Sequence, residues 1–337
     1  MDGVLLAGDV GATKTRLALY RLKNRKLEES VSERYESNSA QGLGELVHRF
    51  LAAHPSKIDA ACFGLPGPVR HGTAKLTNIS WTLAESELAR QLGVAHVRLL
   101  NDLAVIASAL PHLTESDLVT LHRGKEPAGE FEDTVFTVVA PGTGLGEGFA
   151  VRSAGIFTPF PSQGGHAEFA PTDELQTKLY NYLKAHYGRV SLERVLSGPG
   201  LFNIYQFLRD ERLLPEPAEL RDEISAAPDP VRIISDCGLA DRHEICAKSL
   251  DIFCSVLGTE AGDVMLRYLS YGGVFLGGGI PPRILPKLQR GPLLSNYFNK
   301  GRMTELVKDC SLHVIRDDRV ALLGAAAAAA SQLQSAA

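Results

Sequence analysis

A short segment near the N-terminus combines a carboxylate, glycines and hydroxyls at a spacing that suits a phosphate group. Residues 8–16 read Gly-Asp-Val-Gly-Ala-Thr-Lys-Thr-Arg, between an apolar run at 4–7 and an alternating run at 15–22, both typical of strands. Backbone N–H groups and hydroxyls in such a turn can bind a phosphate tail. The Asp9 carboxylate can hold a hydrated Mg²⁺ beside it. The candidate phosphate-binding residues are Gly8, Asp9, Val10, Gly11, Ala12 and Thr13.

Two commoner phosphate loops do not fit this segment. A Walker A loop has Gly directly before Lys-Ser/Thr and leads into a helix, whereas Thr13 precedes Lys14 and a strand is expected next. The fingerprint Gly-x-Gly-x-x-Gly at the start of a helix, which binds dinucleotides, is also absent. What remains is a phosphate turn between two strands.

The pair Asn101-Asp102 lies where a predicted strand, 96–100, gives way to a predicted helix, 104–110. Ligands bind at the carboxyl ends of strands in open α/β sheets. Asp102 can take the proton of a hydroxyl that attacks phosphorus, and Asn101 can hold the same molecule by donating and accepting hydrogen bonds. The alternative is that Asp102 only caps the helix, and the pair taken alone favours that alternative.

Two further glycine-rich segments follow predicted strands. The first, 142–146, comes after the strand 134–140 and offers bare backbone to a second phosphate. The second, 277–279, comes after the strand 273–276 and suits close approach of an adenine or a ribose. Either segment can equally be a packed turn. The candidate residues here are Gly142, Thr143, Gly144, Gly277 and Gly278.

A third set of residues suits a sugar. In Gln163-Gly164-Gly165-His166 the two glycines can let the backbone approach a ligand, and His166 can hydrogen-bond to hydroxyls. Glu193 can accept bonds from two sugar hydroxyls. The alternatives are a surface or core histidine and a solvated glutamate in the first turn of a helix.

The composition is that of an ordinary globular protein. The chain has 337 residues, enough for two domains or one large one. Its net charge of −4 gives no electrostatic reason to expect nucleic acid or an anionic membrane. No apolar run approaches the roughly 20 residues of a membrane span, and the N-terminus lacks the features of a signal peptide. Five scattered cysteines predict reduced, mostly buried thiols, as in a cytoplasmic protein.

The order of the predicted elements indicates a mixed sheet covered by helices, followed by a repeat of its first part. Three strands precede an alternation of helices and strands, and the strand–glycine turn–strand unit near residue 9 recurs near residue 143. We interpret this as a duplicated half-domain with a nucleotide between the halves. The other expected elements are a strand at 26–36, a helix at 44–54, a strand at 58–64, a helix at 84–92 with a Thr82–Glu85 capping box, helices at 173–186 and 320–332, a long helix or a broken pair at 243–269, a strand at 313–316 and an exposed loop at 213–230.

Taken in order, these motifs resemble those of the bacterial glucokinases of the hexokinase and actin-like ATPase superfamily. The resemblance extends from about residue 4 to about residue 324 and is most specific at 193–200, Glu-Arg-Val-Leu-Ser-Gly-Pro-Gly. The zinc-binding cluster of the related repressor/open-reading-frame/kinase group is missing. The motifs that carry the resemblance are 8–16, 65–68, 100–102, 140–146, 164–166, 193–200 and 273–280.

The resemblance implies an α/β, actin-like ATPase (ribonuclease H-like) fold, with two lobes, a mixed sheet in each and an interlobe cleft. It implies a small domain of residues 1–106 plus 318–337, a large domain of 107–317, and a homodimer. The activity would be ATP-dependent, Mg²⁺-assisted phosphorylation of glucose at its 6-hydroxyl by in-line transfer. Asp102 would be the general base, and Asp9 would face the metal through water. Asn101, Gln163, His166 and Glu193 would hold glucose; residues 8–13 and 142–144 would hold the phosphates; Gly277 and Gly278 would lie at the adenosine.

Two residues depart from the family pattern at the sugar motif. Gln163 stands where the family usually has Glu, and Glu168 where it commonly has Asp. An amide accepts on one side only, so the expected loss is about 1 kcal/mol, or roughly fivefold in affinity. We therefore expect a raised glucose KM or a preference for a related hexose. The alternatives are a kinase for an amino sugar or another small substrate, and a weakly active sugar-binding regulator on the same fold.

Overall fold

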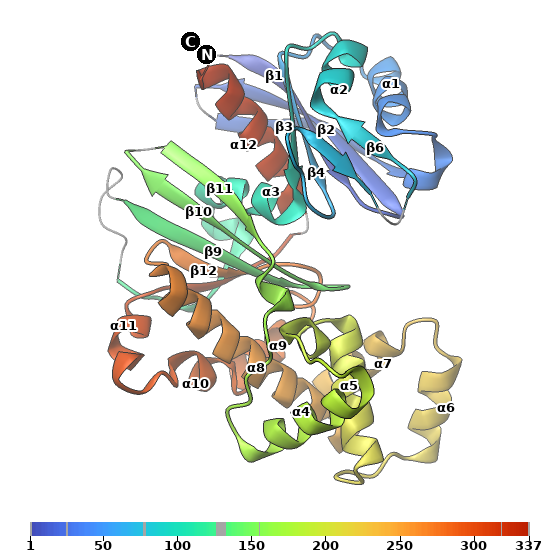
Figure 1. Cartoon of the computed structure of the whole chain (residues 1–337), viewed down its shortest axis with the longest axis vertical. Helices are drawn as coiled ribbons and strands as arrows, with labels where there is room; N and C mark the ends of the chain where they lie inside the picture. Colours follow the sequence, from blue (N-terminus) through green and yellow to red (C-terminus); the bar gives the residue numbers. More distant parts are fainter. Residues whose placement is uncertain are drawn as a thin grey trace.

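The computed structural model describes residues 2–24, 26–76, 79–125, 133–154, 156–317 and 319–335. The chain is elongated, with one sheet near the end that holds both termini, a second sheet in the middle and most of the helices at the far end (Figure 1). Within the described ranges, no helix combines the length and the apolar character that a membrane span requires.

The first sheet has the strand order β3-β2-β1-β4-β7. Its first three strands are antiparallel neighbours, whereas β1, β4 and β7 run parallel. Consecutive residues face opposite sides, so Leu6 packs toward the α1/α2 face and Leu5 toward α12. The elements are β1 Gly3–Val10, β2 Lys14–Lys23, β3 Lys26–Glu36, α1 Leu43–Ala53, β4 Ala60–Leu65, β5 Thr73–Lys75, β6 Thr82–Ala84, α2 Glu85–Leu92, β7 His96–Asn101 and α12 Val320–Ser335.

The second sheet repeats this plan. Its order is β11-β10-β9-β12-β13-β8, again with three antiparallel neighbours followed by two parallel strands, and with β8 added at the edge. The predicted duplication of the strand–turn–strand unit is therefore confirmed. The strands are β8 Leu118–His122, β9 Thr134–Pro141, β10 Leu145–Ser153, β11 Ile156–Ser162, β12 Gly273–Leu276 and β13 Leu312–Ile315.

Helix α3, Asp102–Ala109, lies between the two sheets together with α12 (Figure 1). It contacts α12 on one side and β9, β10 and β11 on the other. Gly324 lets α12 approach closely, because a Cβ there would overlap the backbone oxygen of Val105. The predicted domain boundary at residue 106 falls inside α3, and the division into 1–106 plus 318–337 and 107–317 stays a prediction.

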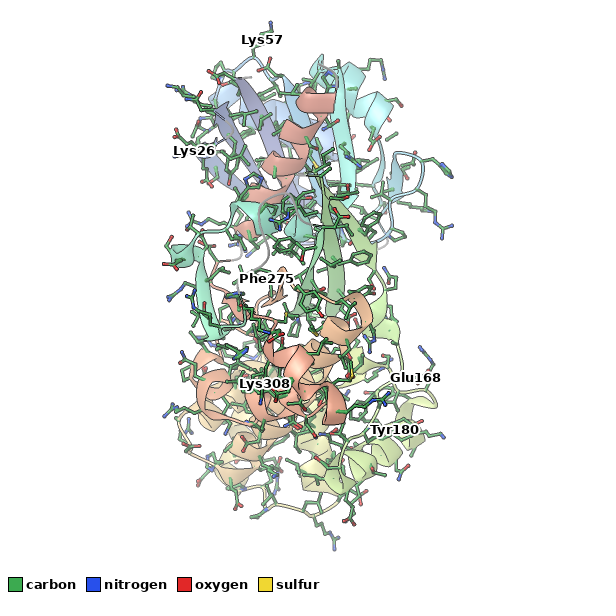
Figure 2. The ribbon with its side chains drawn as sticks, turned by 90° about the vertical axis from the view of Figure 1, so that its left-hand side faces the viewer. Lys26, Lys57, Glu168, Tyr180, Phe275 and Lys308 are labelled. Carbon is green, nitrogen blue, oxygen red and sulfur yellow. The ribbon has the colours of Figure 1, made fainter. Side chains whose placement is uncertain are left out.

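Most remaining helices surround α8, Glu244–Tyr268, which is buried along most of its length. In the rotated view, Phe275 of β12 lies in the middle of the molecule, between the first sheet and these helices (Figure 2). The other helices are α4 Glu174–Tyr187, α5 Gly198–Asp210, α6 Ala218–Ala226, α7 Pro230–Leu239, α9 Leu285–Arg290, α10 Leu293–Phe298 and α11 Thr304–Lys308.

Several sequence predictions are confirmed. The strands at 26–36 and 273–276 are present. Of the two alternatives for 243–269, the structure shows one long helix and not a broken pair. The helices at 44–54, 173–186 and 320–332 are present within one to three residues of their expected ends. All five cysteines are free and buried.

Other predictions are wrong. Thr82 belongs to β6 and caps no helix, and the Glu85 carboxylate instead accepts a hydrogen bond of 2.8 Å from the backbone N–H of Leu99 in β7. The expected exposed loop at 213–230 contains α6, with Leu220 and Ile224 buried against the helical core. The helix expected at 104–110 is present as α3, although it begins two residues earlier, at Asp102. Strands β8 and β11 were not expected.

Candidate active site

Two predicted site segments and the turn after β4 meet at one edge of the first sheet. In the parallel ladder, Asp9 of β1 is paired with Gly64 of β4, and Gly64 is paired with Leu100 of β7. The turn after β1, the turn after β4 and the pair Asn101-Asp102 therefore lie side by side at the carboxyl ends of the strands. This is the edge at which α/β sheets bind ligands.

Asn101 is the helix cap. Its side-chain oxygen accepts the N–H of Leu103 at 3.0 Å, and its amide nitrogen donates to the backbone oxygen of Gly67 at 3.1 Å. Gly67 has φ of +104°, which disfavours any side chain there. Asn101 thus holds the turn after β4 against the start of α3. The residue that caps the helix is therefore Asn101, and not Asp102. The Asn101 amide still has one N–H and one lone pair that a ligand could use.

Asp102 is the first residue of α3, and its carboxylate accepts the N–H of Leu103 at 2.9 Å. Burial raises the pKa of Asp102 from an ordinary value of 3.8 to about 6, the Leu103 N–H opposes this rise, and the negative charge of Asp9 adds to it. A carboxylate with a pKa of about 6 is ionised at neutral pH yet more basic than an exposed aspartate. This is the property that a general base requires.

The turn between β1 and β2 is held by its own backbone and by a serine that directly follows β3. Gly11 N–H donates to Lys14 O at 2.9 Å, and a Cβ on Gly11 would lie 2.9 Å from the same oxygen. Ser37, which is buried, donates through its hydroxyl to Gly11 O and through its N–H to Thr13 O, both at 2.8 Å. The sequence analysis did not select Ser37; its only signal is a hydroxyl directly after an alternating strand.

The second glycine turn joins β9 to β10. Gly142 N–H donates to Gly144 O at 2.8 Å, and Gly198 N–H, at the start of α5, donates to Gly142 O at 2.8 Å. Gly278 has φ of +77°, and a Cβ on it would lie 2.5 Å from the oxygen of Pro141. The predicted adenosine segment therefore lies against the residues that enter the second phosphate turn.

The sugar loop, residues 163–166, packs directly against β10. A Cβ on Gly165 would overlap the backbone oxygen of Leu145, and a Cβ on Gly164 would overlap Oε2 of Glu147. Glycine is therefore required at both positions for the loop to pack on β10, and not only for a ligand to approach the loop. Gln163 is exposed at the start of this loop, and no bond to its side chain is recorded within the described ranges.

Two side chains hold the sugar loop at its outer end. Arg189 donates to the backbone oxygen of His166 and to the Glu168 carboxylate, both at 2.6 Å. Glu193 accepts the N–H of Leu145 at 3.0 Å through Oε2, while its Oε1 lies 4.0 Å from Nδ1 of His166. Glu193 thus bridges the sugar loop and the end of the second phosphate turn, and it is not simply a solvated residue.

The start of α3 joins these two halves of the site. A Cβ on Gly146 would lie 2.5 Å from the side chain of Leu103, and a Cβ on Gly148 would lie 3.1 Å from its backbone oxygen. Asp102 is therefore the neighbour of a residue that packs directly on β10. The same strand begins at the second phosphate turn and supports the sugar loop.

The donor set for a metal is small. Within the described part of the chain, no group of three or more His, Cys, Asp or Glu side chains is placed to hold a metal ion. Asp9 and Asp102 are close enough for the charge of Asp9 to raise the pKa of Asp102. These residues fit a Mg²⁺ that takes most of its ligands from phosphate oxygens and water, as Mg²⁺ usually does.

Comparisons with known proteins agree with this architecture. The crystal structure of a glucokinase from an Antarctic psychrotroph matches with a TM-score of 0.87 and 28% identity, over 98% of this chain and 99% of that one. The fold and the site together define a two-lobed α/β sugar kinase of the actin-like ATPase class.

The family follows from the sequence comparisons. The Glucokinase family model matches residues 6–332. Glucokinases of Nostoc sp. and Trichormus variabilis are each 38% identical over 342 residues, which cover 97% of this chain and 99% of each relative. The chain belongs to the glucokinase family and is a sugar-phosphorylating enzyme.

Proposed function

We propose that this enzyme transfers the terminal phosphoryl group of ATP to the 6-hydroxyl of glucose, with Asp102 as the general base. The observation that carries the proposal is the position of Asp102. It lies beside Asp9 at the carboxyl ends of the first sheet and next to Leu103, which packs on β10. The names of the relatives and the raised pKa of Asp102 support it further.

Glucose would lie between Asp102 and the sugar loop. His166 and Glu193 approach to 4.0 Å, so both can contact one sugar ring. Asn101 retains one N–H and one lone pair, and the exposed Gln163 is available at the edge of the loop. In this proposal the Glu193 carboxylate accepts hydrogen bonds from sugar hydroxyls and weakens its bond to the N–H of Leu145. Because Leu145 ends the second phosphate turn, sugar binding would then affect that turn.

The nucleotide would be held by the two glycine turns across a cleft between the lobes. Residues 8–13 and 142–144 would bind the phosphates through backbone N–H groups, and Gly277 and Gly278 would lie at the adenosine. Asp9 would hold Mg²⁺ through water. When bound, the ion would neutralise charge on the phosphate oxygens.

The transfer itself requires one proton acceptor. As the sugar O6 forms its bond to phosphorus and the bond to the ADP oxygen breaks, the hydroxyl proton passes to the Asp102 carboxylate. Closure of the lobes would exclude water, which competes for the phosphoryl group.

We also propose, on the family resemblance, that the enzyme is a homodimer in the cytoplasm. Light scattering tests the homodimer, and cell fractionation tests the location.

The experiment compares Asp102→Asn and Asp102→Ala with the unmodified enzyme in a coupled assay. We expect turnover to fall by about 10²–10⁴-fold, the usual contribution of a general base, while calorimetric glucose affinity stays within about tenfold. A variant that keeps more than a tenth of its turnover would remove Asp102 from this role. A panel of hexoses and amino sugars, run in the same assay, tests the substrate, and an absence of turnover on all of them would favour a sugar-binding regulator.

A further inference from the structure

A buried pair of carboxyl groups lies directly beneath the sugar loop. Glu147 of β10 and Glu260 of α8 are both about 2% exposed, and they lie close enough for the negative charge of Glu260 to raise the pKa of Glu147. Oε2 of Glu147 takes the space that a side chain on Gly164 would need. Oε1 of Glu147 is buried without a hydrogen-bond partner in the described part of the chain.

The charges around this pair are unequal. Arg267 of α8 donates to Glu260 at 2.5 Å, but Glu147 has no cation of its own within the described ranges. Asp263 of α8 adds negative charge near Glu260, and Lys300 adds positive charge but binds Asp263 at 2.5 Å.

Two buried carboxylates that share one cation cannot both ionise at low cost. Glu260 therefore keeps the charge opposite Arg267, and Glu147 keeps the proton. Burial, together with the negative charge of Glu260, raises the pKa of Glu147 well above the ordinary glutamate value of 4.5. The remaining titratable groups that face the pair are Asp263, Lys300 and Arg267.

We infer that protonated Glu147 is a positioning residue that supports the sugar loop, and that its ionisation at alkaline pH weakens glucose binding. The inference deepens the proposed function, because it assigns the loop above Glu147 to the sugar. Glu147 touches no substrate. It acts through Gly164, which lies on its carboxyl group, and so through the adjoining Gln163 and His166.

The direction of the pH effect follows from the proton balance. The native protein binds the Glu147 proton more tightly than the unfolded chain does, so this group's contribution to stability is largest at acid pH. That contribution declines as the pH rises from about 4.5 through the higher native pKa. At the alkaline end, a second negative charge lies beneath Gly164 with no second cation to offset it.

The test compares Glu147→Gln with the unmodified enzyme between pH 7 and pH 9.5. Glutamine has the same shape, can donate to Glu260 and cannot ionise. In the unmodified enzyme we expect the glucose KM to rise about fivefold or more at the alkaline end, with kcat changing less. In Glu147→Gln the KM should stay flat. Glu260→Gln should also remove the transition from this range, since Arg267 then stabilises ionised Glu147.

The matched control is Glu216→Gln, which removes a buried carboxylate on a different part of the molecule, bonded to Tyr205 and Arg221. Its KM profile should follow that of the unmodified enzyme. Identical profiles for the unmodified enzyme and Glu147→Gln would overturn the inference.

A second measurement needs no turnover. Hydrogen exchange of residues 163–166 in the sugar-free protein, compared at each pH with Glu147→Gln, should rise at alkaline pH only when Glu147 is present. If exchange behaves this way but no hexose is phosphorylated, the proposed function fails while the support of the loop by Glu147 stands. If exchange is the same in both proteins, the inference fails whatever the substrate is.

Discussion

The raised pKa of Asp102 makes a quantitative prediction about the acid limb of catalysis. If Asp102 is the base and titrates at about 6, about 90% of it is ionised at pH 7 and about 10% at pH 5. The kcat/KM for glucose should therefore fall about tenfold between these values. An aspartate at its ordinary pKa of 3.8 would lose less than about a tenth of the activity over the same range.

The substitution Asp9→Asn tests whether the charge of Asp9 contributes to the raised pKa of Asp102. Because the charge of Asp9 adds to the effect of burial, its removal should move the acid limb to lower pH, although not to 3.8, since burial remains. Glu28→Gln, on the exposed surface of β3, is the control that should leave the limb in place.

The assay varies glucose at saturating ATP over pH 4.5–8, with saturation checked at each pH because the ATP phosphates titrate near pH 6. Carbon-13 NMR of labelled aspartate in the ligand-free protein gives the Asp102 titration directly. The reasoning would be refuted if kcat/KM for glucose did not change between pH 5 and pH 7, or if the acid limb of kcat/KM moved to higher pH in Asp9→Asn.

Three further predictions concern the sugar site, the first phosphate turn and the helical region. Gln163→Glu should lower the glucose KM about fivefold by restoring a charged acceptor, and steady-state kinetics with an unchanged KM and sugar profile would exclude a role for this position. Ser37→Ala should raise the ATP KM several-fold and cost about 1–3 kcal/mol of stability, whereas the exposed Ser39→Ala should do neither. Leu220→Ala should lower the free energy of unfolding in urea by about 2–5 kcal/mol, because α6 packs on the core; a change below about 0.5 kcal/mol would contradict that packing.

Segments whose structure depends on neighbouring residues were predictable. The strand at 26–36 follows from its alternating pattern, and the end of α2 follows from Gly93, which adopts the left-handed conformation that glycine favours. The position of Asp102 after a buried strand made it a candidate, but that position alone favoured a helix cap, and only the order of the motifs along the chain favoured a general base. The repeated strand–turn–strand unit, read twice in the sequence, correctly indicated the duplicated sheet.

Segments whose structure depends on distant partners were not predictable. The prolines and acids of 213–230 suggested a loop, but Leu220 and Ile224, four residues apart, bury one face of α6 on the helical core. Thr82 and Glu85 matched a capping box, yet Glu85 bonds to β7, fourteen positions along the chain, because β6 takes the backbone of Thr82 into a hairpin.

The sequence by itself determined which residues can do the chemistry, because turn geometry, strand alternation and side-chain type are local properties. Only the tertiary structure decided what these residues contact: Asn101 reaches Gly67, and Glu193 reaches Leu145. It also placed Glu147, which the sequence analysis did not select, beneath Gly164 of the sugar loop. These contacts join residues that lie far apart in the chain. They form only when two sheets and the helix between them pack together, and no local pattern encodes that packing.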